Sequence, residues 1–152
     1  MTPRATSIRT RSAGTLLAVL LLVAAAGCMP ADERTFLDRT NALRSSSGIA
    51  SLQEQDTLTA KAEAWAQHMA STGTLAHSNL TSDLGGLRWW ALGENVAYSS
   101  PTTDTLLRLH DMLAASPGHR ANLLNQSFTH MGVGVATDSS GRVWVAEVFA
   151  RL

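Results

Sequence analysis

Two strands near the end of the sequence constrain the fold most. Residues 131–137 (MGVGVAT) and 142–149 (RVWVAEVF) are separated by the turn-forming sequence DSSG at 138–141, which is the pattern of a β-hairpin. Because successive side chains of a strand point to opposite faces, one face of the second strand would carry Val143, Val145, Glu147 and Phe149, and the other Trp144, Ala146 and Val148. Both faces are apolar and need helices to cover them. The sequence therefore predicts an α+β fold, built as a three-layer α/β/α sandwich.

Helical periodicity supplies those layers. Apolar residues recur at helical spacing in residues 32–44 and again in 103–115. A third helix is expected between a cap at Asp56 or Thr57 and a stop at Gly73, and a short strand is expected at 95–98. These segments precede the hairpin, so most of the helical layers come before the central strands in the chain.

The first residues of the chain have the features of a targeting segment. Three arginines precede an 11-residue apolar run at 16–26, which is shorter than the about 20 residues that span a bilayer. The following Ala-Gly-Cys sequence looks like a lipobox, which predicts a signal peptide at 1–27 and lipidation at Cys28. Residues 28–33 would then be a polar tether and 34–152 the folded domain, held at the extracytoplasmic face of a bacterial cell membrane.

Composition limits the function classes that remain. Cys28 is the only cysteine, so the domain would fold without a disulfide. Without the three leader arginines the chain has nine basic and twelve acidic residues, a formal charge of −3. This balance provides no electrostatic surface for nucleic acid.

The segment SPGHRANLLN at 116–125 carries a candidate functional histidine. Ser116 and Pro117 are typical of the first positions of a helix, and two leucines later in the segment would anchor it in the core. The partial positive charge of a helix N-terminus favours a neutral imidazole at His119, the form that binds metal or accepts a proton. With His77 and Glu94 it would form a set of zinc ligands that leaves a position for water. Spacing alone leaves the alternative of a structural histidine open.

Four stretches match a known family in order. They are LTAKAEAWAQHMASTGTLAHS at 58–78, GENVA at 93–97, SPGHRANLLNQSFTHMGVGVA at 116–136 and VWVAEVFA at 143–150. On these motifs the chain resembles the bacterial, disulfide-free branch of the CAP superfamily (cysteine-rich secretory proteins, antigen 5 and pathogenesis-related 1), also called SCP-like. The resemblance covers residues 34–152 and implies the same three-layer α/β/α sandwich.

The resemblance also implies a cavity lined by two histidines and two acidic residues that holds a divalent metal such as zinc in several members. His77 and His119 match the histidines, and Glu94 matches the first acid. The second acid is missing, because Ser116 lies near its place. Asp111 and Glu147 are the remaining acids to consider, and neither is expected to bind metal. A site with three ligands should therefore bind metal more weakly than a complete set of four, or not at all.

The other polar and aromatic candidates have simpler interpretations. Asn95 and Asn122 are expected to orient the cavity through hydrogen bonds. We expect exposed positions for His68 and His130 and a rim position for His110. The remaining pair, Trp89 and Trp90, would be one core and one rim residue, or would line a ligand groove.

These observations favour a binding module over an enzyme. The module would be a lipoprotein whose partners are the membrane, through Cys28, and an envelope lipid, glycan or protein. An N-cap serine directs its oxygen at backbone N–H groups, so Ser116 is expected to be a poor nucleophile. The alternative function is a zinc-dependent hydrolase of peptidase type that uses His77, Glu94 and His119.

Overall fold

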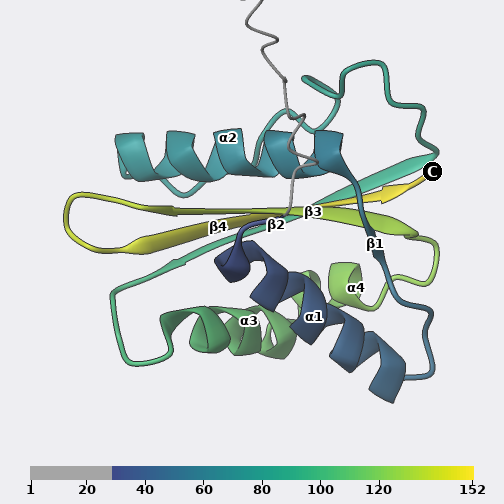
Figure 1. Cartoon of the computed structure of the whole chain (residues 1–152), viewed down its shortest axis with the longest axis horizontal. Helices are drawn as coiled ribbons and strands as arrows, with labels where there is room; N and C mark the ends of the chain where they lie inside the picture. Colours follow the sequence, from purple (N-terminus) through teal and green to yellow (C-terminus); the bar gives the residue numbers. More distant parts are fainter. Residues whose placement is uncertain (1–28) are drawn as a thin grey trace, which may run out of the picture.

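A computed structural model of the chain describes residues 29–152 as a sheet between two helical layers (Figure 1). The predicted signal peptide and Cys28 lie outside the described residues. The strands are β1 (Gln53–Glu54), β2 (Ala91–Ser99), β3 (His130–Thr137) and β4 (Val143–Arg151). They are arranged in the order β1-β3-β4-β2, and only the β1–β3 pair is parallel.

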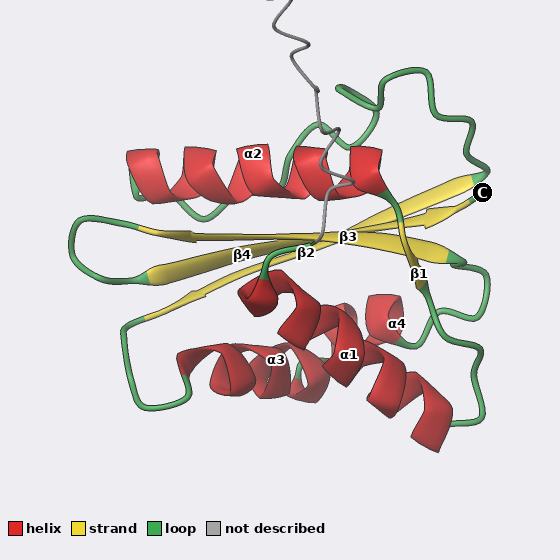
Figure 2. Ribbon diagram, viewed as in Figure 1, coloured by secondary structure: helices red, strands yellow, loops and turns green. Residues whose placement is uncertain are grey.

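The helices divide between the two faces of the sheet (Figure 2). Their bounds are Ala31–Ser46 for α1, Asp56–Thr72 for α2, Thr105–Ala115 for α3 and Pro117–Leu123 for α4. Helix α2 covers one face by itself, and α1, α3 and α4 cover the other. The predicted three-layer sandwich is therefore confirmed.

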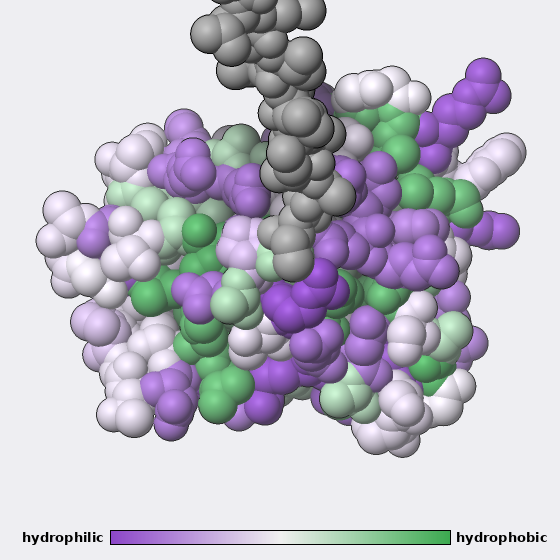
Figure 3. Space-filling model, in the orientation of Figure 1, coloured by the Kyte–Doolittle hydropathy of each residue, from purple (hydrophilic) through white to green (hydrophobic). Residues whose placement is uncertain are grey.

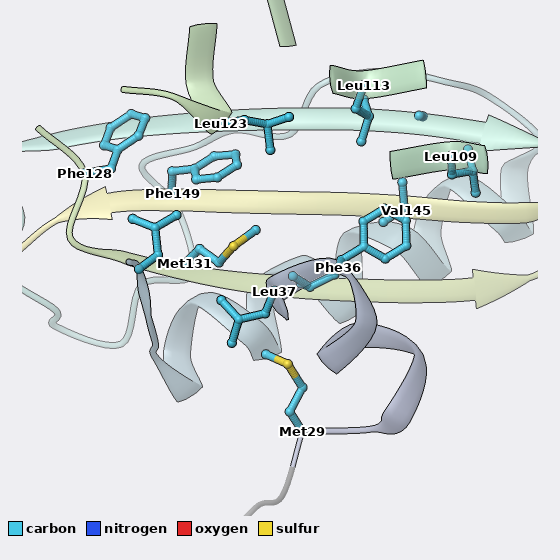
Figure 4. Packing of buried hydrophobic residues seen from close by; sticks show 13 residues of the cluster. Met29, Phe36, Leu37, Leu109, Leu113, Leu123, Phe128, Met131, Val145 and Phe149 are labelled. Carbon is cyan, nitrogen blue, oxygen red and sulfur yellow. The ribbon is translucent and has the colours of Figure 1, made fainter. Parts of the chain in front are cut away.

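The two faces of β4 lie in two separate hydrophobic clusters. Val145 and Phe149 pack with α1, α3 and α4, in the cluster that Figure 4 shows from close by. Trp144 and Val148 pack against α2. Burial of a large apolar side chain contributes about 1.5–3 kcal/mol, so the strand that faces both layers is central to stability.

Two glycines bring α2 unusually close to the sheet. A Cβ atom at Gly132 would collide with the backbone of Leu58 and Thr59, and one at Gly134 would collide with the backbone of Ala62. The small residues that alternate with larger ones in β3 are therefore required by close packing of a helix backbone on a strand.

A buried arginine holds the end of α1 against the segments that follow α4. Arg44 is 1% exposed, and its guanidinium donates to the carbonyl oxygens of Ala50 (2.7 Å), Leu123 (2.9 Å), Asn125 (3.0 Å) and Phe128 (3.3 Å). Four carbonyl partners replace the water that the charged group loses on burial. The sequence pattern of the first helix did not predict this residue as part of the core.

Several local predictions need correction. The predicted polar tether at 28–33 is interrupted, because α1 begins at Ala31 and Met29 is buried against the core. Gln55 caps α2 instead of Asp56 or Thr57, since its side chain accepts the Leu58 N–H at 2.9 Å.

Two further features of the described residues are the lack of a membrane-spanning helix and the distribution of hydrophobic residues on the surface. Within residues 29–152, no helix is long and apolar enough to span a membrane. On the face drawn in Figure 3, hydrophilic residues cover much of the surface and hydrophobic residues form separate small areas.

Candidate functional site

The structure joins two of the predicted site residues directly. Glu94 lies on β2 with its side chain 1% exposed, and its Oε1 is 2.7 Å from Nδ1 of His77, which follows α2 in the chain. The same oxygen accepts the backbone N–H of Ser78 at 2.9 Å. Because a carboxylate oxygen accepts hydrogen bonds, Nδ1 of His77 carries the hydrogen and its Nε2 atom is left free. The His77 side chain is 63% exposed, so a buried carboxylate orients an exposed imidazole.

His119 is the third residue of α4, and its Nδ1 atom is 2.9 Å from Oγ of Ser116. Burial lowers the pKa of His119, and the positive charge of a protonated His77 lowers it further. This direction agrees with a neutral imidazole, but its causes are burial and His77, and the helix N-terminus on which the prediction rested is not among them.

The predicted role of Ser116 is corrected in part. It occupies the N-cap position of α4, but its hydroxyl makes no capping bond to the backbone and contacts the His119 ring instead. The expectation that its oxygen would face backbone N–H groups was therefore wrong. The reason is that the neighbouring imidazole, three residues later, competes for the same hydroxyl.

Two asparagines connect the strands to α4, as predicted. Asn122 donates its amide hydrogens to the backbone oxygen of Glu94 (3.1 Å) and to Oδ1 of Asn95 (2.9 Å). Asn95 in turn donates to the backbone oxygen of His119 (3.2 Å) and to Oε2 of Glu147 (2.9 Å). This network fixes the position of α4, and with it the backbone of His119, relative to β2 and β4.

Glu147 belongs to this network, which the sequence did not predict. Its side chain is fully buried on β4, and burial raises its pKa to about 7, while the bond from Asn95 opposes the rise. Its second oxygen, Oε1, has no hydrogen-bond partner among residues 29–152. The signal was present in the strand alternation, which placed this carboxyl on an apolar face.

The predicted set of three zinc ligands does not fit this geometry. Oε1 of Glu94 is already occupied by His77 and Ser78, and its Oε2 is enclosed without a partner in the described part of the chain. Across residues 29–152, no three His, Cys, Asp or Glu residues are grouped so that they could hold a metal ion. Glu94 contacts Nδ1 of His77 and acts on this imidazole as an orienting group.

The remaining candidates lie apart from this site. Asp111 forms an ion pair with Arg39 at 2.6 Å on the exposed side of α3. His110 was expected at a rim, but it is 4% exposed, with its ring 3.4 Å from the Thr40 hydroxyl, and burial lowers its pKa.

The two adjacent tryptophans do not divide between core and rim. Trp89 is 39% exposed and Trp90 is 82% exposed. They lie just before β2, which is an edge strand of the sheet. Its first residue, Ala91, pairs with Arg151 at the end of β4. The prediction of one core residue was therefore wrong, whereas the prediction that His68 is exposed is confirmed.

Comparison with known proteins gives a consistent result. The family model of the cysteine-rich secretory protein family (CAP) matches residues 37–148. The uncharacterized protein YkwD of Bacillus subtilis is 30% identical over 126 residues, which are 78% of this chain and 47% of that protein. The chain thus spans about half the length of this curated relative.

Two solved structures show the same arrangement of helices and strands. An extracellular protein containing a SCP domain from Bacillus anthracis superposes with a TM-score of 0.66 at 26% identity, over 80% of this chain and 40% of that one. An outer surface protein of Borrelia burgdorferi superposes with a TM-score of 0.68 at 17% identity, over 79% of this chain and 92% of that one. The second likeness is one of fold alone.

Proposed function

Because the chain belongs to the cysteine-rich secretory protein (CAP) family, of the bacterial type, we propose that it is an extracytoplasmic binding module that presents His77 and His119 to a ligand. The observation that carries the proposal is the use of Glu94. Its Oε1 atom accepts from both His77 and Ser78, and its Oε2 atom is buried, so the contacts that Glu94 makes are those of an orienting group. The site is built to orient side chains.

The two histidines have the features of a recognition surface. His77 is exposed but held by a buried carboxylate, and His119 is held by the Asn95–Asn122 network. Preorganised side chains bind a ligand with a smaller entropy cost than mobile ones. A divalent cation such as zinc would have the two Nε2 atoms as its protein ligands, fewer than the three of a typical catalytic zinc site.

Zinc titration and a hydrolysis assay test this proposal together. We expect residues 29–152 to bind zinc weakly in calorimetry, with binding lost in His77→Ala and in His119→Ala and retained in the control His68→Ala, which removes an exposed histidine of α2. We expect no turnover of quenched fluorescent peptides with or without zinc. Turnover that disappears in His77→Ala would show an enzyme and overturn the proposal.

We also propose that the protein is a lipoprotein anchored through Cys28. The supporting observations are the basic and apolar N-terminal sequence, the lipobox-like residues before Cys28, and relatives described as extracellular or as surface proteins. A Cys28→Ser protein should move from the membrane fraction to the soluble fraction of expressing cells. Unchanged membrane association would contradict lipid anchoring.

A further inference from the structure

A cavity lies on the side of α2 that faces away from the sheet, and neither site histidine lines it, although Ser78, which follows His77, does. Its volume is about 420 Å³, within the range of small-molecule sites. Helix α2 forms one wall, and the loop that joins α2 to β2 returns past the first half of the helix and forms the other (Figure 1).

The helix wall combines two small residues with an aromatic pair. Ala60 and Ala64 are one turn apart, so their short side chains leave a trough along the helix surface. The rings of Trp65 and His68 are stacked at the end of this trough, with centroids 4.7 Å apart and planes inclined by 20°. The indole is held in place, because its Nε1 donates to the backbone oxygen of Ala76 at 2.8 Å.

The loop wall is fixed by a buried lysine. Lys61 is 6% exposed, and its ammonium donates to the backbone oxygens of Asn79 (2.8 Å) and Ser82 (3.1 Å). Two of the three N–H donors of Lys61 therefore hold the loop, and the residue also lines the cavity. The Ser82 hydroxyl donates to a carboxylate oxygen of Asp83 at 2.7 Å, and both residues line the cavity.

The Ser78 hydroxyl does not face this cavity. Ser78 lines the cavity, but its hydroxyl oxygen is enclosed and makes no hydrogen bond to any described residue. A ligand in the cavity therefore does not contact this oxygen in the present conformation. The cavity offers a ligand an aromatic surface and the carboxylate of Asp83.

We propose that this cavity binds a neutral saccharide. A sugar ring has an apolar face of C–H groups, which suits the Trp65–His68 pair, and an edge of hydroxyl groups, which donate to the Asp83 carboxylate. A phosphate or sulfate would meet the negative charge of Asp83, and the Lys61 ammonium already donates to two carbonyls. An acyl chain would offer no donor to the Asp83 carboxylate. The proposal goes beyond the histidine site and does not depend on it.

Saturation-transfer NMR with three neutral probes, chitotriose, cellotriose and maltotriose, tests the proposal on residues 29–152. We expect transfer to the C–H groups of at least one trisaccharide, and a dissociation constant from calorimetry that rises at least tenfold in Ala64→Arg, which fills the trough from an exposed helix position. Asp83→Asn should also weaken binding. The matched control Ala42→Arg, an exposed alanine of α1, should bind like the parent.

Four results would overturn the saccharide site. The first is the absence of transfer to all three probes, and the second is equal binding by the parent and Ala64→Arg. Displacement of the sugar by palmitate or inorganic phosphate at lower concentration would also contradict it, in favour of those ligands. Binding that is lost in His77→Ala but kept in Ala64→Arg would move the sugar to the histidine site.

Discussion

The buried carboxyl of Glu147 should make the stability of the domain depend on pH in an unusual direction. Its pKa is raised from 4.5 to about 7 by complete burial, which corresponds to a free-energy difference of about 3 kcal/mol. Between these values the folded protein keeps a proton that the unfolded chain has released, so stability falls as the pH rises. We expect Glu147 to contribute a loss of about 2 kcal/mol between pH 5 and pH 8.

Urea unfolding of the parent and Glu147→Gln at pH 5, 6, 7 and 8 measures this contribution. The variant should gain about 2 kcal/mol relative to the parent between pH 5 and pH 8. Glu33, whose pKa burial also raises to about 7, acts in the same direction, while the lowered pKa values of His110 and His119 act in the opposite one. These groups are present in both proteins, so the difference isolates Glu147.

An exposed carboxyl provides the matched control for this experiment. Asp38→Asn changes an exposed side chain of α1 that forms no ion pair with another described residue, and it should leave the pH dependence of the parent unchanged. The reasoning is refuted if Glu147→Gln and the parent lose the same stability between pH 5 and pH 8. That outcome would mean that Glu147 binds no more protons in the folded state than in the unfolded chain.

Three further substitutions test other parts of the structure. Arg44→Met should lower the free energy of unfolding by at least about 3 kcal/mol in urea titrations, because four carbonyl groups lose their donor; a change below about 1 kcal/mol would contradict it. Gly132→Ala should abolish cooperative thermal unfolding, since its Cβ meets the backbone of α2, whereas the matched Gly118→Ala, which has open space around it, should stay within about 1 kcal/mol of the parent. Asn122→Ala removes two hydrogen bonds beside Glu94 and should shift the ring resonances of His119 in NMR spectra; unchanged resonances would show that the network does not position this histidine.

Local patterns were sufficient for the fold. The alternation in residues 142–149 showed apolar side chains on both faces of a strand, and two helical layers follow from that. Helix ends were also predictable where a single residue decides them: Gly73 ends α2 with a φ of 65°, a conformation that glycine adopts without steric cost. The site residues could be named because the motifs around His77, Glu94 and His119 resemble those of a family.

The roles of those residues were decided by tertiary structure. His77 and Glu94 are 17 residues apart in the sequence. No local sequence pattern predicts that the Glu94 carboxylate contacts Nδ1 of the imidazole instead of a metal ion. Arg44 and His110 are polar residues on amphipathic helices, yet both are buried, because their partners arrive from distant segments. The sequence by itself determined which faces must be covered, since burial of apolar surface depends on local periodicity. Only the folded chain decided which polar groups would satisfy one another, because that depends on contacts between residues far apart in sequence.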